Sequence, residues 1–150
     1  MTASLPPLPD SAIVIGGVAA DWRSALGLVA GALTASGATD AGYGQSMLDM
    51  VEEHGPYIVI APGLALAHAR PGPEVHHDGL AVVTLAAPVV FGHPHNDPVR
   101  VLLGLAVAFV GSHLDSIGAL ANTFNDATVT DRLARATTPD EVRQIMGMTQ

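Results

Sequence analysis

Residues 57–71 read YIVIAPGLALAHARP, and this run carries the clearest indication of the fold. Its first part, Tyr57–Ala61, is a short apolar run with β-branched side chains, which is typical of a buried strand. Pro62 and Gly63 then predict a turn, and a second apolar segment leads into His68. The run therefore predicts two adjoining extended segments, the second of which ends at a histidine.

The flanking sequence predicts helices near both ends of the chain and strands in the middle. Apolar runs bounded by turn residues predict further strands at Ala12–Ile15, Leu80–Leu85, Val89–Phe91 and Val99 to about Phe109. Helical patterns, two of them preceded by the capping residues Asp21 and Thr138, predict helices at 22–36, 40–51, 113–124, 127–136 and 139–146. This order favours an α/β sandwich in which helices pack on a sheet.

The chain length and composition predict one domain with a core of small side chains. A chain of 150 residues fits a single domain, which we expect to span residues 11–150. Residues 1–10, MTASLPPLPD, are rich in proline and are expected to form a flexible arm. Hydrophobic residues make up 49% of the chain, but aromatic residues only 4%, with Tyr57 and Phe91 expected in the core.

Several classes of protein are disfavoured by the same composition. The longest uncharged apolar run, Val101–Gly111, is too short to span a membrane, and the N-terminus lacks the basic region of a signal peptide. With no cysteine in the chain, a cytoplasmic protein is expected. The net charge is −8 and the six basic residues, all arginine, are scattered, which argues against nucleic-acid binding.

The seven histidines are the main candidates for chemistry. Most histidines are simply solvated or hydrogen-bonded. The neighbours His76 and His77, and the pair His93 and His95, have spacings that a metal-binding module could use. They lie in loop-like sequence, and Pro94 interrupts a regular strand between the second pair, so we predict no metal site.

The other chemical role considered for a histidine is that it becomes phosphorylated. A neutral imidazole nitrogen is a competent nucleophile near pH 7, and the transferred phosphoryl group needs preorganised hydrogen-bond donors around its oxygens. His68 fits on local grounds, because Ala67 and Ala69 are small and Arg70 is close. Composition alone does not distinguish it from the other histidines.

Four ordered segments do distinguish His68. They are Tyr43–Leu48, Gly55–Pro71, the stretch from Asp78 to Phe91, and the stretch from Asn96 that continues to Ser112-His113-Leu114. Together they resemble the type-2 enzyme IIA domains of the bacterial phosphotransferase system, and the ascorbate-type branch most. The resemblance covers roughly residues 12–147.

The resemblance implies a fold and a reaction. The fold would be that of the mannitol/fructose-type enzyme IIA, a three-layer-like α/β sandwich with a mixed sheet flanked by helices. His68 would accept a phosphoryl group from the phosphocarrier HPr and pass it to a cysteine of enzyme IIB, which serves the membrane enzyme IIC. His113 matches the second active-site histidine, which helps to stabilise the phosphoryl group. Gln45, Arg70 and Ser112 are the expected phosphate-binding residues, and no cofactor is implied.

The chain also departs from the family pattern. Ala67 stands where the family has proline, and Met50-Val51 replaces the Arg-Glu pair of the mannitol type, so other groups must stabilise the phosphoryl group. Three questions stay open: which carbohydrate is imported, L-ascorbate being one candidate; whether phosphorylation instead regulates partner binding; and whether the chain forms a homodimer.

Overall fold

The computed structural model of the chain describes residues 5–148, apart from the side chains of residues 110–113. Its strands are β1 (Ile13–Gly17), β2 (Val59–Ala61), β3 (Leu64–His68), β4 (Gly79–Val89) and β5 (Val99–Ala106). Its helices are the 3-10 helix η1 (Asp10–Ala12) and the α-helices α1 (Trp22–Ala35), α2 (Gly42–His54), α3 (Val110–Phe124), α4 (Val129–Arg135) and α5 (Pro139–Ile145). Among the described residues, no helix combines the length and hydropathy needed to cross a membrane.

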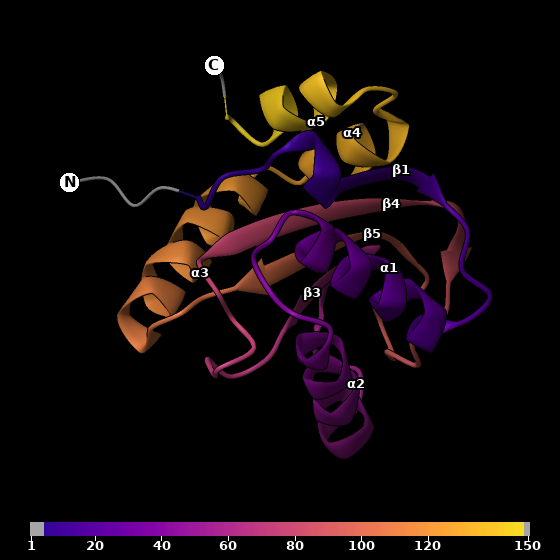
Figure 1. Cartoon of the computed structure of the whole chain (residues 1–150). Helices are drawn as coiled ribbons and strands as arrows, with labels where there is room; N and C mark the ends of the chain where they lie inside the picture. Colours follow the sequence, from indigo (N-terminus) through magenta and orange to yellow (C-terminus); the bar gives the residue numbers. More distant parts are fainter. Residues whose placement is uncertain (1–4, 149–150) are drawn as a thin grey trace.

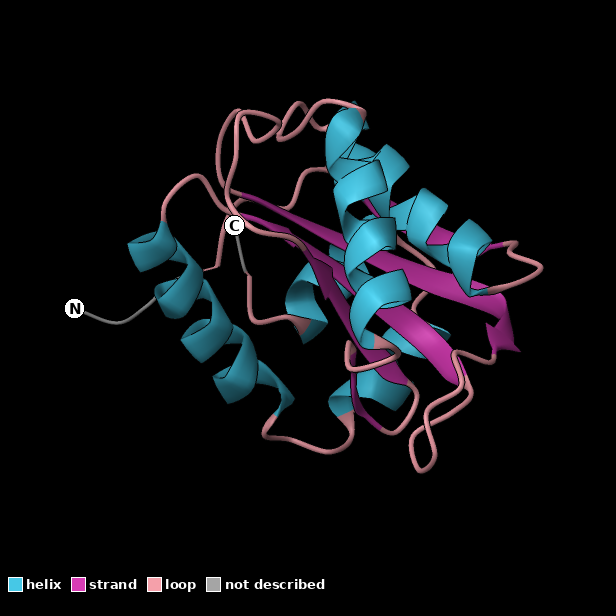
Figure 2. Ribbon diagram, turned by 90° about the horizontal axis from the view of Figure 1, so that it is seen from below, coloured by secondary structure: helices cyan, strands magenta, loops and turns pink. Residues whose placement is uncertain are grey.

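The strands form one mixed sheet in the order β1-β4-β5-β3-β2. Figure 1 shows α1 and α2 below this sheet and α4 and α5 above it, and Figure 2 gives the view from below. The expectation of a mixed sheet flanked by helices is confirmed. β4 pairs antiparallel with β5, whereas β3 pairs parallel with β5. β3 and β5 therefore end at the same edge of the sheet, where His68 lies opposite Leu105.

Helix α1 lies close to the sheet because the strand residue that faces it, Gly104 of β5, has no side chain. A Cβ atom on Gly104 of β5 would lie 2.4 Å from Cγ1 of Val29 on α1, well inside van der Waals contact. Val29 is completely buried, so it has little space into which it can move. The core of small side chains expected from the sequence thus allows a close contact between helix and sheet.

Two strand ends differ from the predictions. Separate strands were expected at Leu80–Leu85 and Val89–Phe91, but the structure has the single strand β4, whose register shifts between Thr84 and Val89. β5 ends at Ala106 rather than near Phe109. The physical reason is that the backbone N–H of Ala108 donates to Oδ1 of Asp78 at 2.8 Å, and α3 then begins at Val110.

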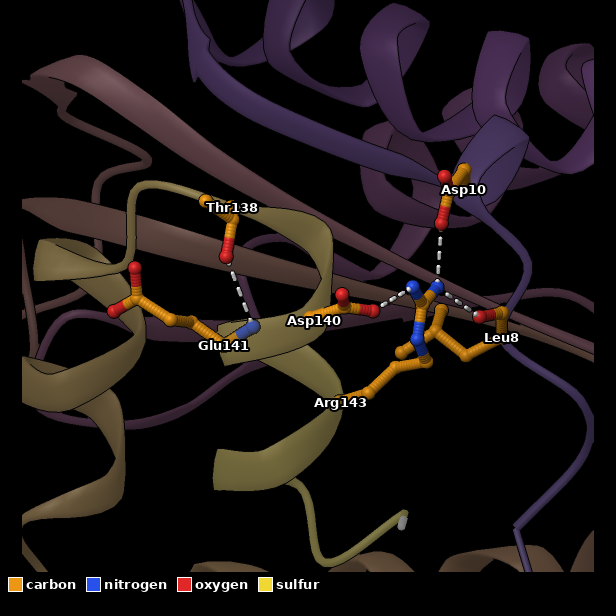
Figure 3. A network of polar contacts seen from close by, with 6 residues as sticks. All are labelled: Leu8, Asp10, Thr138, Asp140, Glu141 and Arg143. Carbon is orange, nitrogen blue, oxygen red and sulfur yellow. Dashed lines mark hydrogen bonds and ion pairs between the residues drawn. The ribbon is translucent and has the colours of Figure 1, made fainter. Parts of the chain in front are cut away.

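The N-terminal segment is held to the domain by Arg143 of α5 (Figure 3). Its guanidinium donates to the carbonyl oxygen of Leu8 at 3.1 Å and pairs with the carboxylates of Asp10 at 2.7 Å and Asp140 at 2.6 Å. Leu8 is 4% exposed and belongs to the hydrophobic core. Residues 8–10 are thus packed against the domain, in contrast to the flexible arm expected over residues 1–10, of which residues 1–4 are outside the described part.

Asp21 caps α1, as the sequence predicts. Its Oδ1 accepts a hydrogen bond from the backbone N–H of Ser24 at 2.8 Å, and this bond lowers the pKa of Asp21 below its usual value of 3.8. A lowered folded-state pKa stabilises the fold above the unfolded-state value, and the contribution is lost as the pH falls through the folded-state pKa.

We therefore predict that Asp21→Asn, which keeps a capping oxygen but no charge, makes the contribution of the cap to stability independent of pH in the acidic range. The wild type is expected to be the more stable protein near pH 7, and its advantage should disappear at about pH 2. Denaturant unfolding at both pH values measures the difference. If the wild type kept the same stability advantage at low pH, Asp21 would not be acting as a charged cap.

Candidate functional site

His68 is the last residue of β3 and is partly buried at the sheet edge. Its Nδ1 lies 3.3 Å from the carbonyl oxygen of Leu66. Because a carbonyl oxygen can only accept a hydrogen bond, this contact favours the tautomer that carries the proton on Nδ1. The basic lone pair is then on Nε2, which is the ring atom able to act as a nucleophile.

Tyr57 stands beside His68. The centroids of the two rings are 6.1 Å apart and the rings meet edge-on, at 84°. Tyr57 makes a similar edge contact with His54, at 6.0 Å. Tyr57 is 39% exposed, so the prediction that it belongs to the core is wrong, whereas Phe91, at 7%, is buried as predicted. Tyr57 precedes β2 in a turn, which leaves its ring at the surface.

An apolar groove of about 280 Å³ opens beside His68, between strands β2 and β3 and helix α3. Its lining includes Tyr57 and Ile60 on one side and Ile117 and Phe124 of α3 on the other. Ile60 is 51% exposed although it is large and apolar. Sequence reasoning missed this groove, because a short edge strand gives too few alternating residues to show which of its faces is covered.

Arg70 lies in a second groove, of about 480 Å³, between α2 and the loop that follows β3. The same groove is lined by the acidic side chains of Asp49, Glu53 and Glu74. In the described part of the chain, none of the ion pairs within 4.0 Å involves Arg70. Arg70 therefore shares its groove with three carboxylates, and within the described residues it forms no ion pair with any of them.

The other predicted phosphate-binding residues have different placements. Gln45 is exposed on α2, and its side-chain amide donates to Oδ1 of Asp49 at 2.8 Å, one turn further along the helix. Ser112 and His113 fall in the first turn of α3, but their side chains lie outside the described residues. Since only three residues separate β5 from α3, this turn begins within about 14 Å of chain from the sheet edge.

The four histidines considered for a metal site, His76, His77, His93 and His95, lie in loops. Nδ1 of His93 accepts from the backbone N–H groups of His95 and Asn96, at 3.1 and 3.0 Å. The side chain of Asp97 accepts from the N–H groups of three residues, Phe91 to His93, and so shapes this turn. Among the residues whose side chains are described, no group of three or more potential ligands is placed to hold a metal ion.

A family model matches nearly the whole chain. It is described as the phosphoenolpyruvate-dependent sugar phosphotransferase system, EIIA 2, and it matches residues 7–147. Among curated proteins, the chain is 39% identical over 129 residues to the ascorbate-specific PTS system EIIA component of Shigella boydii. That match covers 85% of this chain and 84% of the relative.

Solved structures agree with this match. IIA mannitol of Escherichia coli superposes with a TM-score of 0.82 at 27% identity, over 93% of this chain and 99% of that protein. The complex of enzyme IIA and phosphorylated enzyme IIB for mannitol, also from Escherichia coli, contains a chain that matches with a TM-score of 0.82 at 25% identity. That match covers 95% of this chain and 99% of the other.

Proposed function

The chain belongs to the EIIA 2 family of the phosphoenolpyruvate-dependent sugar phosphotransferase system, and we propose that His68 is the residue on which it carries the phosphoryl group. The chain is thus a phosphotransferase, and the resemblance to the ascorbate-type branch that the sequence indicates is confirmed. The observation that supports His68 most is its position at the end of β3 with Nδ1 against the Leu66 carbonyl oxygen, a contact that favours the tautomer with its nucleophilic lone pair on Nε2.

In the proposed reaction, His68 is both acceptor and donor. Nε2 attacks the phosphorus of a phosphohistidine on HPr, so that a new N–P bond forms while the N–P bond to HPr breaks and its imidazole leaves. A cysteine thiolate of enzyme IIB then attacks the same phosphorus, an S–P bond forms, and His68 leaves as imidazole. Enzyme IIB would serve the membrane enzyme IIC, and the exchange would take place in the cytoplasm without a cofactor.

The charge on the phosphoryl oxygens needs donors, because most of the stabilisation in phosphoryl transfer is electrostatic. Only three residues lie between the end of β5 and the start of helix α3, and a helix N-terminus favours anions. We assign His113 and Ser112 of that turn to the phosphoryl group, with Arg70 as the cation nearest in sequence. The amide of Gln45 is engaged with Asp49, so Gln45 would have to exchange this partner in order to contribute.

The proposed partners and substrate follow from the relatives. Enzyme IIB is supported as the acceptor by the similar enzyme IIA chain, which is found in a complex with phosphorylated enzyme IIB. L-Ascorbate is supported as the carbohydrate by the relative that is ascorbate-specific. The apolar groove beside His68 is the surface on which we expect HPr and enzyme IIB to dock in turn.

Reconstitution tests this proposal. The protein is incubated with phosphoenolpyruvate, enzyme I and HPr, and we expect its intact mass to rise by one acid-labile phosphoryl group. Addition of an ascorbate-specific enzyme IIB should remove the group faster than a mannitol-specific one does. A chain that takes up no phosphoryl group would refute the proposal. A chain that is phosphorylated but donates to no enzyme IIB would favour a regulatory role.

We predict that Ile60→Glu weakens docking without changing the chemistry at His68. Placing a charge in the groove forfeits apolar contact worth about 1.5–3 kcal/mol, so KM for phosphorylated HPr should rise about tenfold or more, while kcat stays within about twofold. Val90→Glu is the matched control, because Val90 is also exposed, at 66%, but follows β4 at the opposite end of the sheet. Equal effects of the two variants would contradict the assignment of the groove.

A further inference from the structure

The hydroxyl of Tyr43 connects the ends of the two strands that form the candidate site. It accepts a hydrogen bond from the backbone N–H of Ala69 at 2.9 Å, and it lies 2.8 Å from the carbonyl oxygen of Leu105, to which it donates. A longer contact, of 3.3 Å, joins it to the carbonyl oxygen of Ala69. Ala69 directly follows His68, and Leu105 is the register partner of His68 on β5.

These two backbone groups face each other in the parallel ladder of β3 and β5. In a parallel ladder, the N–H of one residue is directed to the carbonyl that precedes its register partner. His68 pairs with Leu105, so the N–H of Ala69 is the natural partner of the Leu105 carbonyl. The Tyr43 hydroxyl stands between the two groups and satisfies both. The hydroxyl therefore links the backbone of β5 to the residue that follows His68, at the point where β3 ends.

The Tyr43 hydroxyl can make both hydrogen bonds at any physiological pH. Tyr43 is 1% exposed and lies on α2, the helix that also lines the groove of Arg70. Burial raises the pKa of Tyr43 to about 12, so the hydroxyl keeps the proton that it donates to Leu105. Ala69 is also buried, at 3% exposure, and a buried N–H without a partner is costly.

We propose that Tyr43 is a positioning residue for phosphoryl transfer, whose hydroxyl fixes the backbone of His68 relative to β5 by bridging Ala69 and Leu105. The inference rests on the proposed function of His68 and adds a residue of α2 to it. The imidazole can reach an in-line donor only from a narrow range of backbone positions, and a displacement of about 1 Å can cost about 100-fold in rate. Among the described residues, the hydrogen bonds of its hydroxyl go to backbone groups, so Tyr43 acts through the backbone that carries His68.

The test removes this hydroxyl and keeps the ring. Tyr43→Phe removes the hydrogen bonds of the hydroxyl to the Ala69 N–H and the Leu105 carbonyl, and we expect the loss of this bridge to loosen the backbone position of His68. We expect kcat for phosphorylation by HPr to fall about 10- to 100-fold, with KM for HPr within about twofold, when rates are expressed per folded molecule. The ring ¹⁵N resonances of His68 should shift in the same variant.

A matched control is offered by Thr84→Val. The hydroxyl of Thr84 is also buried and accepts from a backbone N–H, that of Gly16, at 3.0 Å. Thr84 pairs with Val101 near the start of β5, about 13 Å along that strand from the partner of His68. Thr84→Val should therefore lower stability without changing kcat. Equal losses of kcat in the two variants would show that Tyr43 contributes to stability and does not position His68.

Two further outcomes separate the inference from the proposed function. A wild-type protein that is phosphorylated on His68 and a Tyr43→Phe variant with unchanged kcat would overturn the inference alone. A wild-type protein that takes up no phosphoryl group would overturn the proposed function. The inference can also be tested without a variant, because the Ala69 amide should exchange its proton far more slowly than exposed loop amides. Fast exchange at Ala69 would contradict the hydrogen bond on which the inference depends.

Discussion

Replacement of His68 by alanine is expected to abolish phosphorylation by HPr. The substitution removes the ring nitrogen that forms the bond to phosphorus, and no other side chain at the end of β3 can take its place. His68 is only partly buried at the end of a strand, so the variant should fold and keep its circular dichroism spectrum. Transfer of labelled phosphate from phosphoenolpyruvate through enzyme I and HPr measures the effect.

Histidines outside the site provide the controls for this experiment. His76→Ala and His95→Ala alter exposed loop residues, and both variants should be labelled to the same extent as the wild type. Label that persists in His68→Ala, or label that is lost in either control, would show that the phosphoryl group is carried elsewhere.

The second large effect is expected on stability, from Gly104→Val. A Cβ atom at position 104 would lie 2.4 Å from Cγ1 of Val29 and 3.3 Å from Cδ1 of Leu33, both on α1. Those side chains are completely buried, so α1 must move away from the sheet. Overpacking of this kind costs about 3 kcal/mol, which we expect as a loss in the free energy of unfolding measured with denaturant.

Gly27→Ala is the control for the substitution at position 104. Gly27 is an exposed residue of α1 whose Cβ atom would meet nothing within 4 Å. Alanine is the better helix former by about 1 kcal/mol, so this variant should be slightly more stable than the wild type. A Gly104→Val variant that unfolds at the wild-type denaturant concentration would show that α1 does not pack on the sheet as closely as described.

Local signals in the sequence predicted the helices well. Asp21 and Thr138 both accept the hydrogen bonds expected of N-caps, from Ser24 and Glu141, and α1 and α5 begin at the residues that follow them. Caps act through bonds between residues three apart, which a linear sequence contains in full. The order of helices and strands was enough to indicate an α/β sandwich.

Contacts between distant residues explain what the sequence did not show. β5 ends early because of a carboxylate on Asp78, 30 residues away from the N–H that it accepts. Residues 8–10 are held by Arg143, which lies 135 residues from Leu8. Tyr57, which is expected in the core, lies instead in the turn before β2.

The candidate site was predictable only in part. His68 could be named because the ordered segments around it resemble a family, and residues of the same segments predicted Gln45, Arg70, Ser112 and His113. The apolar groove and the Tyr43 hydroxyl could not be named, since each depends on strands and helices that meet only in the folded chain. The available signal for Tyr43 was its four-residue spacing from Met47 and Val51, which places the three residues on one buried face of α2.

The central claim is that Nε2 of His68 carries the phosphoryl group, and NMR of the phosphorylated protein tests it most directly. ¹⁵N-labelled protein is phosphorylated by HPr, and long-range ¹H–¹⁵N spectra assign the modified ring nitrogen by its coupling to phosphorus. We predict one phosphohistidine, at Nε2 of His68, with the Nδ1 proton retained. A phosphoryl group on Nδ1 of His68, or on any other histidine, would contradict the account.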